Sequence, residues 1–248
     1  MAWVHAVIDV PAQQHARTAQ FWADALGWRA GAAWPTHPEL RSFQPPSGAP
    51  YVHLQQILGP PRVHLDLEAE APAATVDHAI GLGAELTAVA DRWQTLRSPG
   101  GLAFCVLPAQ QHEPPQPITF SDGHHARMVQ ICIDSPRSVH TREVDFWRAV
   151  LPGRWTPLGD TEFAGKWHDD TGSPLQLLFQ QLDEVSGATR AHLDQGTDNV
   201  ALEVRRLIDL GANDVGSGRG WHVLRDVAGL AFCVTGNSPE QTQHRDLG

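Results

Sequence analysis

Polar and apolar positions near the start of the chain follow two periods in turn. Residues 3–9 alternate, with His5 and Asp9 on the polar side, and this period of two predicts a strand with one buried face. Residues 13–26 then place apolar side chains at helical spacing, and Gly27 is typical of a helix end. We therefore expect a strand followed by a helix.

The pattern continues in the same manner through the first hundred residues. A second helix is predicted over residues 73–82 and is closed by Gly83. Further strands are predicted near Trp28 and Leu40 and over residues 51–58, 62–68, 93–97 and 102–107. The resulting order is β-α-β-β-β, twice.

The second half of the chain repeats the first. Residues 8–11 (IDVP) reappear as 133–136 (IDSP), displaced by 133 − 8 = 125 positions. Residues 101–106 (GLAFCV) recur unchanged as 229–234, displaced by 229 − 101 = 128 positions. Solenoid units span only about 20 to 50 residues, so a repeat of this length is a whole domain. We predict domain 1 over 1–108, a linker over 109–126, domain 2 over 127–240 and a tail over 241–248.

The predicted linker is rich in proline, glutamine and histidine. Its prolines favour an extended polyproline conformation. No pattern of metal ligands surrounds His112, His124 and His125, so we interpret them as solvated loop residues.

Composition and charge exclude several classes of protein. The 18 lysines and arginines against 28 acidic residues give 18 − 28 = −10, which argues against a nucleic-acid partner and gives no attraction to an anionic membrane. No apolar run approaches the ~20 residues that cross a bilayer, and the first residues lack the pattern of a secretory signal. Cys105, Cys132 and Cys233 form neither a CxxC pair nor a disulfide framework. We expect a cytoplasmic protein.

Several short motifs in a fixed order carry a family resemblance. They are Phe21-Trp22, residues 26–28 (LGW), 63–67 (VHLDL), 82–84 (LGA) and 101–106 (GLAFCV). Together with the β-α-β-β-β order they resemble the vicinal oxygen chelate superfamily, in particular its glyoxalase-like, bleomycin-resistance-type branch. The resemblance implies an α+β fold of two tandem domains, each built from two βαβββ modules. It further implies a cupped, mostly antiparallel eight-stranded sheet per domain, with helices outside and a ligand pocket inside.

The resemblance also implies which residues face the pocket. The four metal-ligand positions of the superfamily correspond in the first copy to His5, Gln55, His64 and Cys105, and in the second to Gln130, Gln180, His192 and Cys233. The expected pocket further includes His53, Asp66 and Asp194. Strand alternation supports the placement of His64 and Cys105 on one face.

Two interpretations of these positions stay open. In the favoured one, His5 and His64 line a wet pocket without a metal, because glutamine, a poor metal ligand, replaces His5 in the second copy. In the other, His5, His64 and Cys105 bind a divalent metal in domain 1. This ligand set suits zinc better than magnesium or manganese, and iron is the other candidate.

Catalytic roles are not assigned to any residue. A nucleophilic Cys105 beside His64 lacks an evident third group that would orient the histidine. Asp66 and Asp194 share a strand face with the motif histidines, and we expect them to form internal ion pairs with Arg97 and Arg225.

The sequence thus predicts a protein that binds a small organic molecule, a metabolite or an antibiotic, without an obligatory metal. The alternative is a divalent-metal-dependent lyase, isomerase or dioxygenase. No nucleic-acid or membrane partner is expected. We expect a monomer in which the two domains pair with each other.

Overall fold

The structure, a computed structural model, describes residues 3–159, 162–169 and 172–240, so the predicted tail over 241–248 lies outside it. The first copy contains β1 (Val4–Pro11), α1 (Ala12–Leu26), β2 (Arg29–Ala33), β3 (Leu40–Gln44), β4 (Val52–Ile57), β5 (Arg62–Ala69), α2 (Pro72–Gly81), β6 (Glu85–Val89), β7 (Gln94–Arg97) and β8 (Ala103–Pro108). After β9 (Ile118–Thr119), the second contains β10 (His125–Ser135), α3 (His140–Val150), β11 (Arg154–Pro157), β12 (Phe163–His168), β13 (Gln176–Gln181), β14 (Arg190–Thr197), α4 (Val200–Asp209), β15 (Asn213–Ser217), β16 (Trp221–Arg225) and β17 (Ala231–Thr235). Both copies therefore have the predicted β-α-β-β-β order twice.

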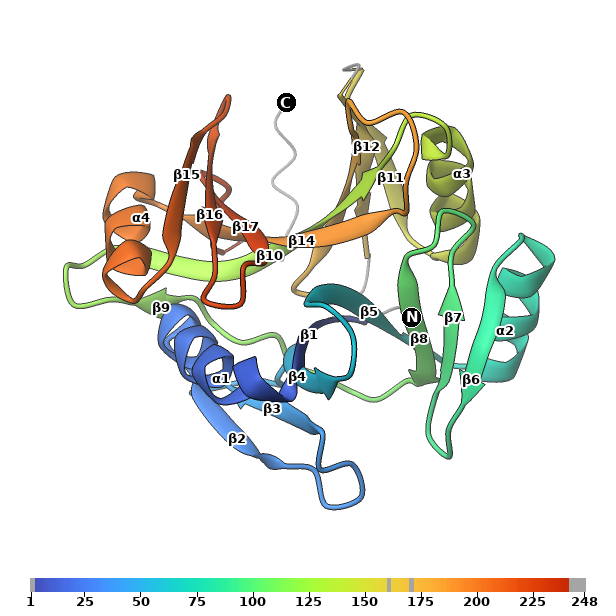
Figure 1. Ribbon diagram of the computed structural model, residues 1–248, viewed down its shortest axis with the longest axis horizontal. Coiled ribbons are helices and arrows are strands. Elements are labelled where there is room, and N and C mark those ends of the chain that lie inside the picture. The colour runs from blue at the N-terminus through green and yellow to red at the C-terminus, as the bar shows by residue number, and fades with distance from the viewer. Residues whose placement is uncertain (1–2, 160–161, 170–171, 241–248) are drawn as a thin grey trace. The chain divides into compact units, whose positions relative to one another are not determined.

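The strands form two sheets with equivalent strand orders. The first is β2-β3-β4-β1-β5-β8-β7-β6 and the second is β11-β12-β13-β10-β14-β17-β16-β15, with β9 added on β10. The pairs β5·β8 and β14·β17 are parallel, whereas β2·β3, β3·β4, β7·β8 and β16·β17 are antiparallel. The four helices lie outside the sheets (Figure 1). The predicted α+β fold of two glyoxalase-like repeats is confirmed.

Residue contacts divide the chain into two compact units, and each unit draws on both copies. The first comprises the chain up to Ala6, His64–Gln111 and Ile131–Ala191, while the second comprises Val7–Val63, His112–Gln130 and the chain from His192 onward. Helices α2 and α3 belong to the first unit, and α1 and α4 belong to the second. The repeat in the sequence and the packing in space thus follow different divisions.

Strand β1 is buried on both faces, and the prediction of a single buried face is wrong. His5 is 6% exposed and Asp9 is fully buried, as are the apolar residues between them. Asp9 accepts a hydrogen bond from Nε of Arg62 at 2.7 Å. The polar side of this strand is therefore buried and has charged partners, which alternation alone does not predict.

Helix α1 ends where the sequence predicts. Gly27 adopts a left-handed conformation with φ of 65°, which glycine reaches without strain, and its N–H donates to the carbonyl of Asp24 at 3.2 Å. Helix α1 contacts β2 and β4, and its Phe21 and Trp22 are buried. None of the helices in the described residues has both the length and the apolar character needed to cross a membrane.

Each compact unit is centred on aromatic side chains from both copies. In the first unit, the ring centroids of Phe104 on β8 and Trp147 on α3 lie 5.1 Å apart. In the second unit, those of Trp22 on α1 and Phe232 on β17 lie 5.2 Å apart. Both pairs meet edge to face, an arrangement that adds to the free energy gained by burying the rings. The helix of one copy thus packs on the last strand of the other.

The indole N–H of each of these tryptophans donates to a buried carboxylate. Trp22 donates to Oδ2 of Asp226, in the turn before β17, at 2.8 Å. Trp147 donates at 2.8 Å to Oε1 of Glu143, one turn earlier in its own helix, and Oε2 of Glu143 accepts from the N–H of Gly100 at 2.7 Å. Burial raises the pKa of both carboxyl groups, Asp226 and Glu143.

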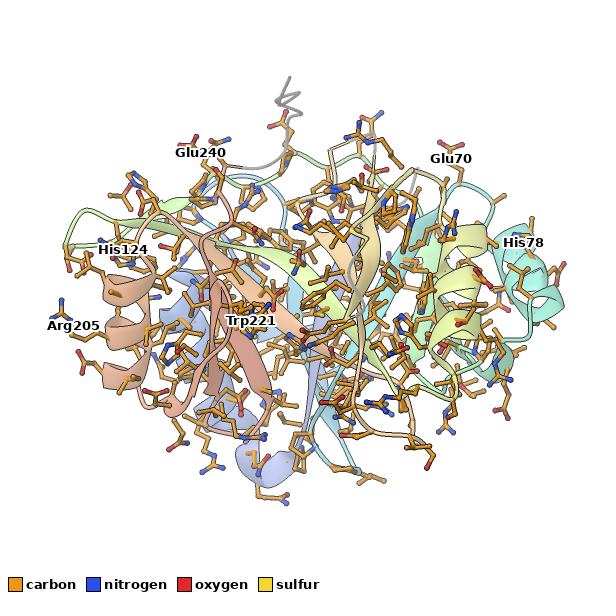
Figure 2. All side chains as sticks on the ribbon, turned by 90° about the horizontal axis from the view of Figure 1, so that it is seen from above. Glu70, His78, His124, Arg205, Trp221 and Glu240 are labelled. Carbon is orange, nitrogen blue, oxygen red and sulfur yellow. The ribbon has the colours of Figure 1, made fainter. Side chains whose placement is uncertain are left out.

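The linker histidine His124 is buried, so its predicted solvation is wrong. Its Nε2 lies 2.6 Å from Oε2 of Glu203 on α4, and its Nδ1 contacts Asp122. Figure 2 shows His124 beside the orange helix α4. Glu203 is fully buried and also accepts from Nε of Arg206 at 2.8 Å. The Arg206 guanidinium lies 3.6 Å from the ring centroid of Phe120. A buried carboxylate requires hydrogen-bonded or charged partners, and the linker supplies one of them.

Candidate functional site

Strands β5 and β8 bring three potential ligands together in the first unit. The two strands are parallel neighbours with Asp66 opposite Cys105, and His64 shares the face of Asp66 because it is two residues away. Nε2 of His64 lies 3.3 Å from Oδ1 of Asp66. One ligand atom from each of His64, Asp66 and Cys105 lies within 4.8 Å of the others. We call this group the first-copy cluster.

Strands β14 and β17 repeat the arrangement in the second unit. Asp194 is opposite Cys233, and Nε2 of His192 lies 3.2 Å from Oδ1 of Asp194 and 3.5 Å from Sγ of Cys233. These three residues again offer ligand atoms within 4.8 Å of one another. We call this group the second-copy cluster.

The direction of approach to the histidine tells a ligand cluster from a catalytic relay. In a relay, the nucleophile meets one ring nitrogen and the orienting carboxylate meets the other. In the second-copy cluster, the sulfur of Cys233 and the carboxylate of Asp194 both approach Nε2 of His192. Ligand atoms of all three residues thus meet at Nε2 of His192, and the same grouping suits a cation in place of the hydrogen on that nitrogen.

The thiol of the first-copy cluster is not prepared as a nucleophile. Burial, followed by the charge of Asp66, raises the pKa of Cys105, and a hydrogen bond from His64 only partly opposes this. The hydroxyl of Thr95 lies 3.5 Å from its Sγ. A cation between these donors would favour the thiolate, whereas the cation-free site favours the thiol.

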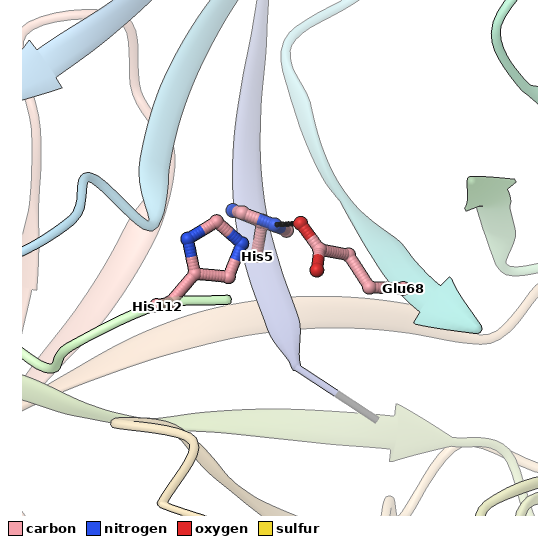
Figure 3. Close-up of side chains that lie close together, drawn as sticks. All are labelled: His5, Glu68 and His112. Carbon is pink, nitrogen blue, oxygen red and sulfur yellow. Dashed lines mark hydrogen bonds and ion pairs between the residues drawn. The ribbon is translucent and has the colours of Figure 1, made fainter. Parts of the chain in front are cut away.

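His5 is bound by a glutamate that the sequence analysis did not select. Nε2 of His5 lies 3.0 Å from Oε1 of Glu68 (Figure 3). Oε2 of Glu68 accepts a hydrogen bond from the N–H of Gln110 at 2.8 Å. Glu68 is 2% exposed. It follows His64 and Asp66 on the same face of β5, so strand alternation alone could have identified it.

The other expected pocket residues have partners of their own. Nδ1 of His53 lies 2.9 Å from Oγ of Ser42, and Gln180 donates to Oε1 of Glu162 at 2.7 Å. Gln55, on β4, is half-buried. In the second copy, the side-chain amide of Gln130 donates to Oδ2 of Asp194.

Asp66 and Asp194 form ion pairs, but the prediction that their partners are arginines is wrong. The salt bridges of these carboxylates run to the histidine two residues earlier on the same strand. Arg97 and Arg225 are exposed, and Arg225 donates to the carbonyl of Gly229 at 2.9 Å. Exposure at the end of a strand costs an arginine little, whereas pairing inside the protein would require its desolvation.

The architecture of two repeats agrees with a comparison of the sequence with family profiles. The glyoxalase-like domain profile matches residues 5–107 and again residues 130–235. The chain belongs to this family. It is a tandem member of the vicinal oxygen chelate superfamily, as the sequence motifs predict. None of the curated proteins matches this glyoxalase-like chain significantly.

Solved structures with the same fold include metal-dependent enzymes. The glyoxalase-like chain is 15% identical to a Mn(II)-bound glyoxalase from Novosphingobium aromaticivorans, with a TM-score of 0.68 over 97% of this chain and 84% of that one. It is 13% identical to a halotolerant catechol dioxygenase, with a TM-score of 0.61 over 94% of this chain and 85% of that one. A variant of homoprotocatechuate 2,3-dioxygenase from Brevibacterium fuscum is 12% identical, with a TM-score of 0.63 over 99% and 74% of the two chains. At these identities the likeness shows the fold alone.

The donors of the glyoxalase-like chain fit a metal of a particular class. Each cluster combines one imidazole, one carboxylate and one thiol, all at least half-buried. Thiolate and imidazole ligands favour zinc and similar soft or borderline ions, whereas magnesium and manganese prefer oxygen ligands. The clusters therefore fit zinc better than they fit manganese, the metal in the Novosphingobium glyoxalase.

Proposed function

We propose that the chain is a metal-dependent member of the vicinal oxygen chelate superfamily that acts on a small organic molecule. The observation that supports this most strongly is the recurrence of one ligand set, His–Asp–Cys, at equivalent positions of both copies. One buried polar triplet has many structural explanations. Two triplets with the same residues and register at equivalent positions point to a ligand set that both copies inherited.

The residues of the first-copy cluster have separable roles in this proposal. His64, Asp66 and Cys105 would hold the ion, and Thr95 would donate a hydrogen bond to the sulfur. When bound, such an ion polarises oxygen atoms of a substrate. A substrate with two adjacent oxygens, such as a catechol or a 2-oxo-hydroxy compound, suits this chemistry and the kinds of enzyme that share the fold.

A second candidate is metal-free binding of a small molecule, which the sequence alone favours. Gln130 and Gln180 support it, because both stand at ligand positions of the superfamily yet make hydrogen bonds to acidic side chains of the second copy. In that case the histidines and amides would hydrogen-bond the ligand directly.

Metal analysis separates the two candidates. The chain is purified without chelator, and its metal content is compared with that of a His64→Ala/His192→Ala double variant and of His53→Ala, a buried histidine outside both clusters. We expect zinc in the wild type and in His53→Ala, and its loss in the double variant. A wild type without metal, whose melting temperature nevertheless rises with a catechol or a 2-oxo-hydroxy compound, would support the second candidate instead.

A further inference from the structure

The two clusters have the same residues but different surroundings. The side chain of Asp66 is 21% exposed, whereas that of Asp194 is 4% exposed. A ligand carboxylate must turn its lone pairs toward the ion, so its other contacts affect the affinity. These contacts can be compared position by position because the copies align without ambiguity.

In the second copy, the residue equivalent to His5 makes a hydrogen bond to one oxygen of the ligand carboxylate. Gln130 (130 − 5 = 125) donates its side-chain N–H to Oδ2 of Asp194, and it is only 1% exposed. This bond holds Oδ2, whereas Oδ1 faces Nε2 of His192. A metal that bound both oxygens of Asp194, or that turned the carboxylate toward itself, would have to break a buried hydrogen bond to a charged group. Such a bond weakens the binding of a competing ion by about ten- to a hundredfold.

In the first copy, the equivalent residue is held by a different acceptor. His5 bonds to Glu68, which is fixed by the N–H of Gln110. Glu68 corresponds to Gly196 in the second copy (196 − 68 = 128). A Cβ on Gly196 would lie 2.6 Å from the carbonyl oxygen of Asn237 and 2.8 Å from Cγ2 of Val129, so no side chain fits there. Only the first copy can hold its β1 residue in this way.

The surroundings of the two thiols also favour metal binding in the first copy over the second. Opposite Cys105 on the neighbouring strand stands Thr95, whose hydroxyl lies within hydrogen-bond distance of the sulfur. Opposite Cys233 stands Val223, which has no donor. A hydrogen bond to sulfur stabilises the thiolate that a metal requires.

We infer that the first-copy cluster is the high-affinity site for a zinc-class ion, and that Gln130 closes the second-copy cluster, so that the chain takes up one ion tightly. This inference rests on the proposed function. It adds to that function the number of ions bound, the cluster that binds the ion and the residue, Gln130, that determines both.

Cobalt(II) tests the inference, because a thiolate bound to cobalt gives a charge-transfer absorption that reports the sulfur ligand directly. Metal-free chain is titrated with cobalt(II) in the wild type, in Cys105→Ser and in its matched control Cys233→Ser. We expect one tight equivalent in the wild type, loss of the charge-transfer band in Cys105→Ser and its retention in Cys233→Ser. Circular dichroism melting curves verify that each variant is folded.

A gain-of-binding variant provides the complementary test. Gln130→Leu preserves volume but removes the amide that bonds to Asp194, and we expect a second tight equivalent of cobalt. Two equal equivalents in the wild type, or loss of the band in Cys233→Ser alone, would overturn the inference and leave the proposed function standing. No cobalt–thiolate band in the folded wild type would overturn both.

Discussion

At the scale of single residues, alternation along the strands predicts which side chains share a face but not which of them bond to each other. His64, Asp66 and Cys105 follow from the period of two and from the repeat. The role of Glu68 does not, because a buried ion pair depends on the depth of the strand in the fold. His5 stands at a ligand position of the superfamily, yet its imidazole bonds to Glu68.

Two substitutions test this difference between position and partner. We expect His5→Ala to bind zinc with less than about a tenfold loss of affinity and Asp66→Asn to lose more than about 100-fold, because Asp66 is a proposed ligand whereas His5 bonds to Glu68, outside the proposed ligand set. Competition with a chromophoric zinc chelator measures both affinities. An equal loss in the two variants would make His5 a ligand and the proposed set incorrect.

A second residue-scale prediction concerns the buried carboxyl of Asp226. Burial raises its pKa, so the folded chain keeps this proton at a pH where the unfolded chain has lost it. Between those two pKa values, the contribution of this group to the free energy of unfolding falls as the pH rises.

Asp226→Asn removes that titration. We therefore expect the free energy of unfolding of the wild type, relative to the variant, to be higher at about pH 4 than at about pH 7, with a slope of at most about 1.4 kcal/mol per pH unit. Urea unfolding at the two pH values measures it. A difference that grows with pH would contradict the raised pKa.

At the scale of elements, the two helix–turn contacts show how the copies have diverged. The carboxylate that accepts from the tryptophan lies in the turn at Asp226 in one unit and on helix α3 at Glu143 in the other. The equivalent positions are Ser98 (226 − 98 = 128) and Thr18 (143 − 18 = 125). In one unit the acid is in the turn and the hydroxyl residue is on the helix. In the other unit the acid is on the helix and the hydroxyl residue is in the turn.

This exchange predicts a rescue. Asp226→Ser should lower the free energy of unfolding by about 2 kcal/mol, because it leaves the buried N–H of Trp22 without its acceptor. Adding Thr18→Glu should restore much of the loss, since it recreates the arrangement of the other unit. A double-mutant cycle by urea unfolding gives the coupling. Additive effects would show that the two positions do not substitute for each other.

The hydrophobic pattern of the sequence predicts most helices and strands well, but it misses segments whose apolar residues follow no regular period. Both helices of the first copy begin and end within a residue or two of their predicted limits. Strand β6 was not predicted individually, since all five of its residues are exposed and it has no apolar face. The burial of His124 escaped prediction because its partner, Glu203, lies 79 positions away in sequence.

At the scale of the whole molecule, the repeat does not coincide with the packing. Phe104 and Trp147 come from different copies but one compact unit, and so do Trp22 and Phe232. A single copy therefore lacks half of each aromatic core. We propose that the chain is a monomer whose copies pair with each other, because each aromatic core takes rings from both copies.

Separating the copies tests that proposal. We expect residues 1–108 alone to aggregate or to self-associate, because Phe104 and Trp22 lose their partners, and we expect co-expression with residues 127–240 to restore a 1:1 complex. Size-exclusion chromatography with light scattering measures the masses. If residues 1–108 alone formed a stable monomer with a cooperative melting transition, the shared cores would be contradicted. A dimer of the full-length chain would contradict the proposal that it is a monomer.

The crowded backbone at Gly196 makes the divergence of the two copies hard to reverse. A glutamate introduced at Gly196 alone would meet the carbonyl oxygen of Asn237 and the side chain of Val129. A change at that one position therefore cannot recreate the pairing that holds His5 in the first copy, and both neighbours would have to move as well.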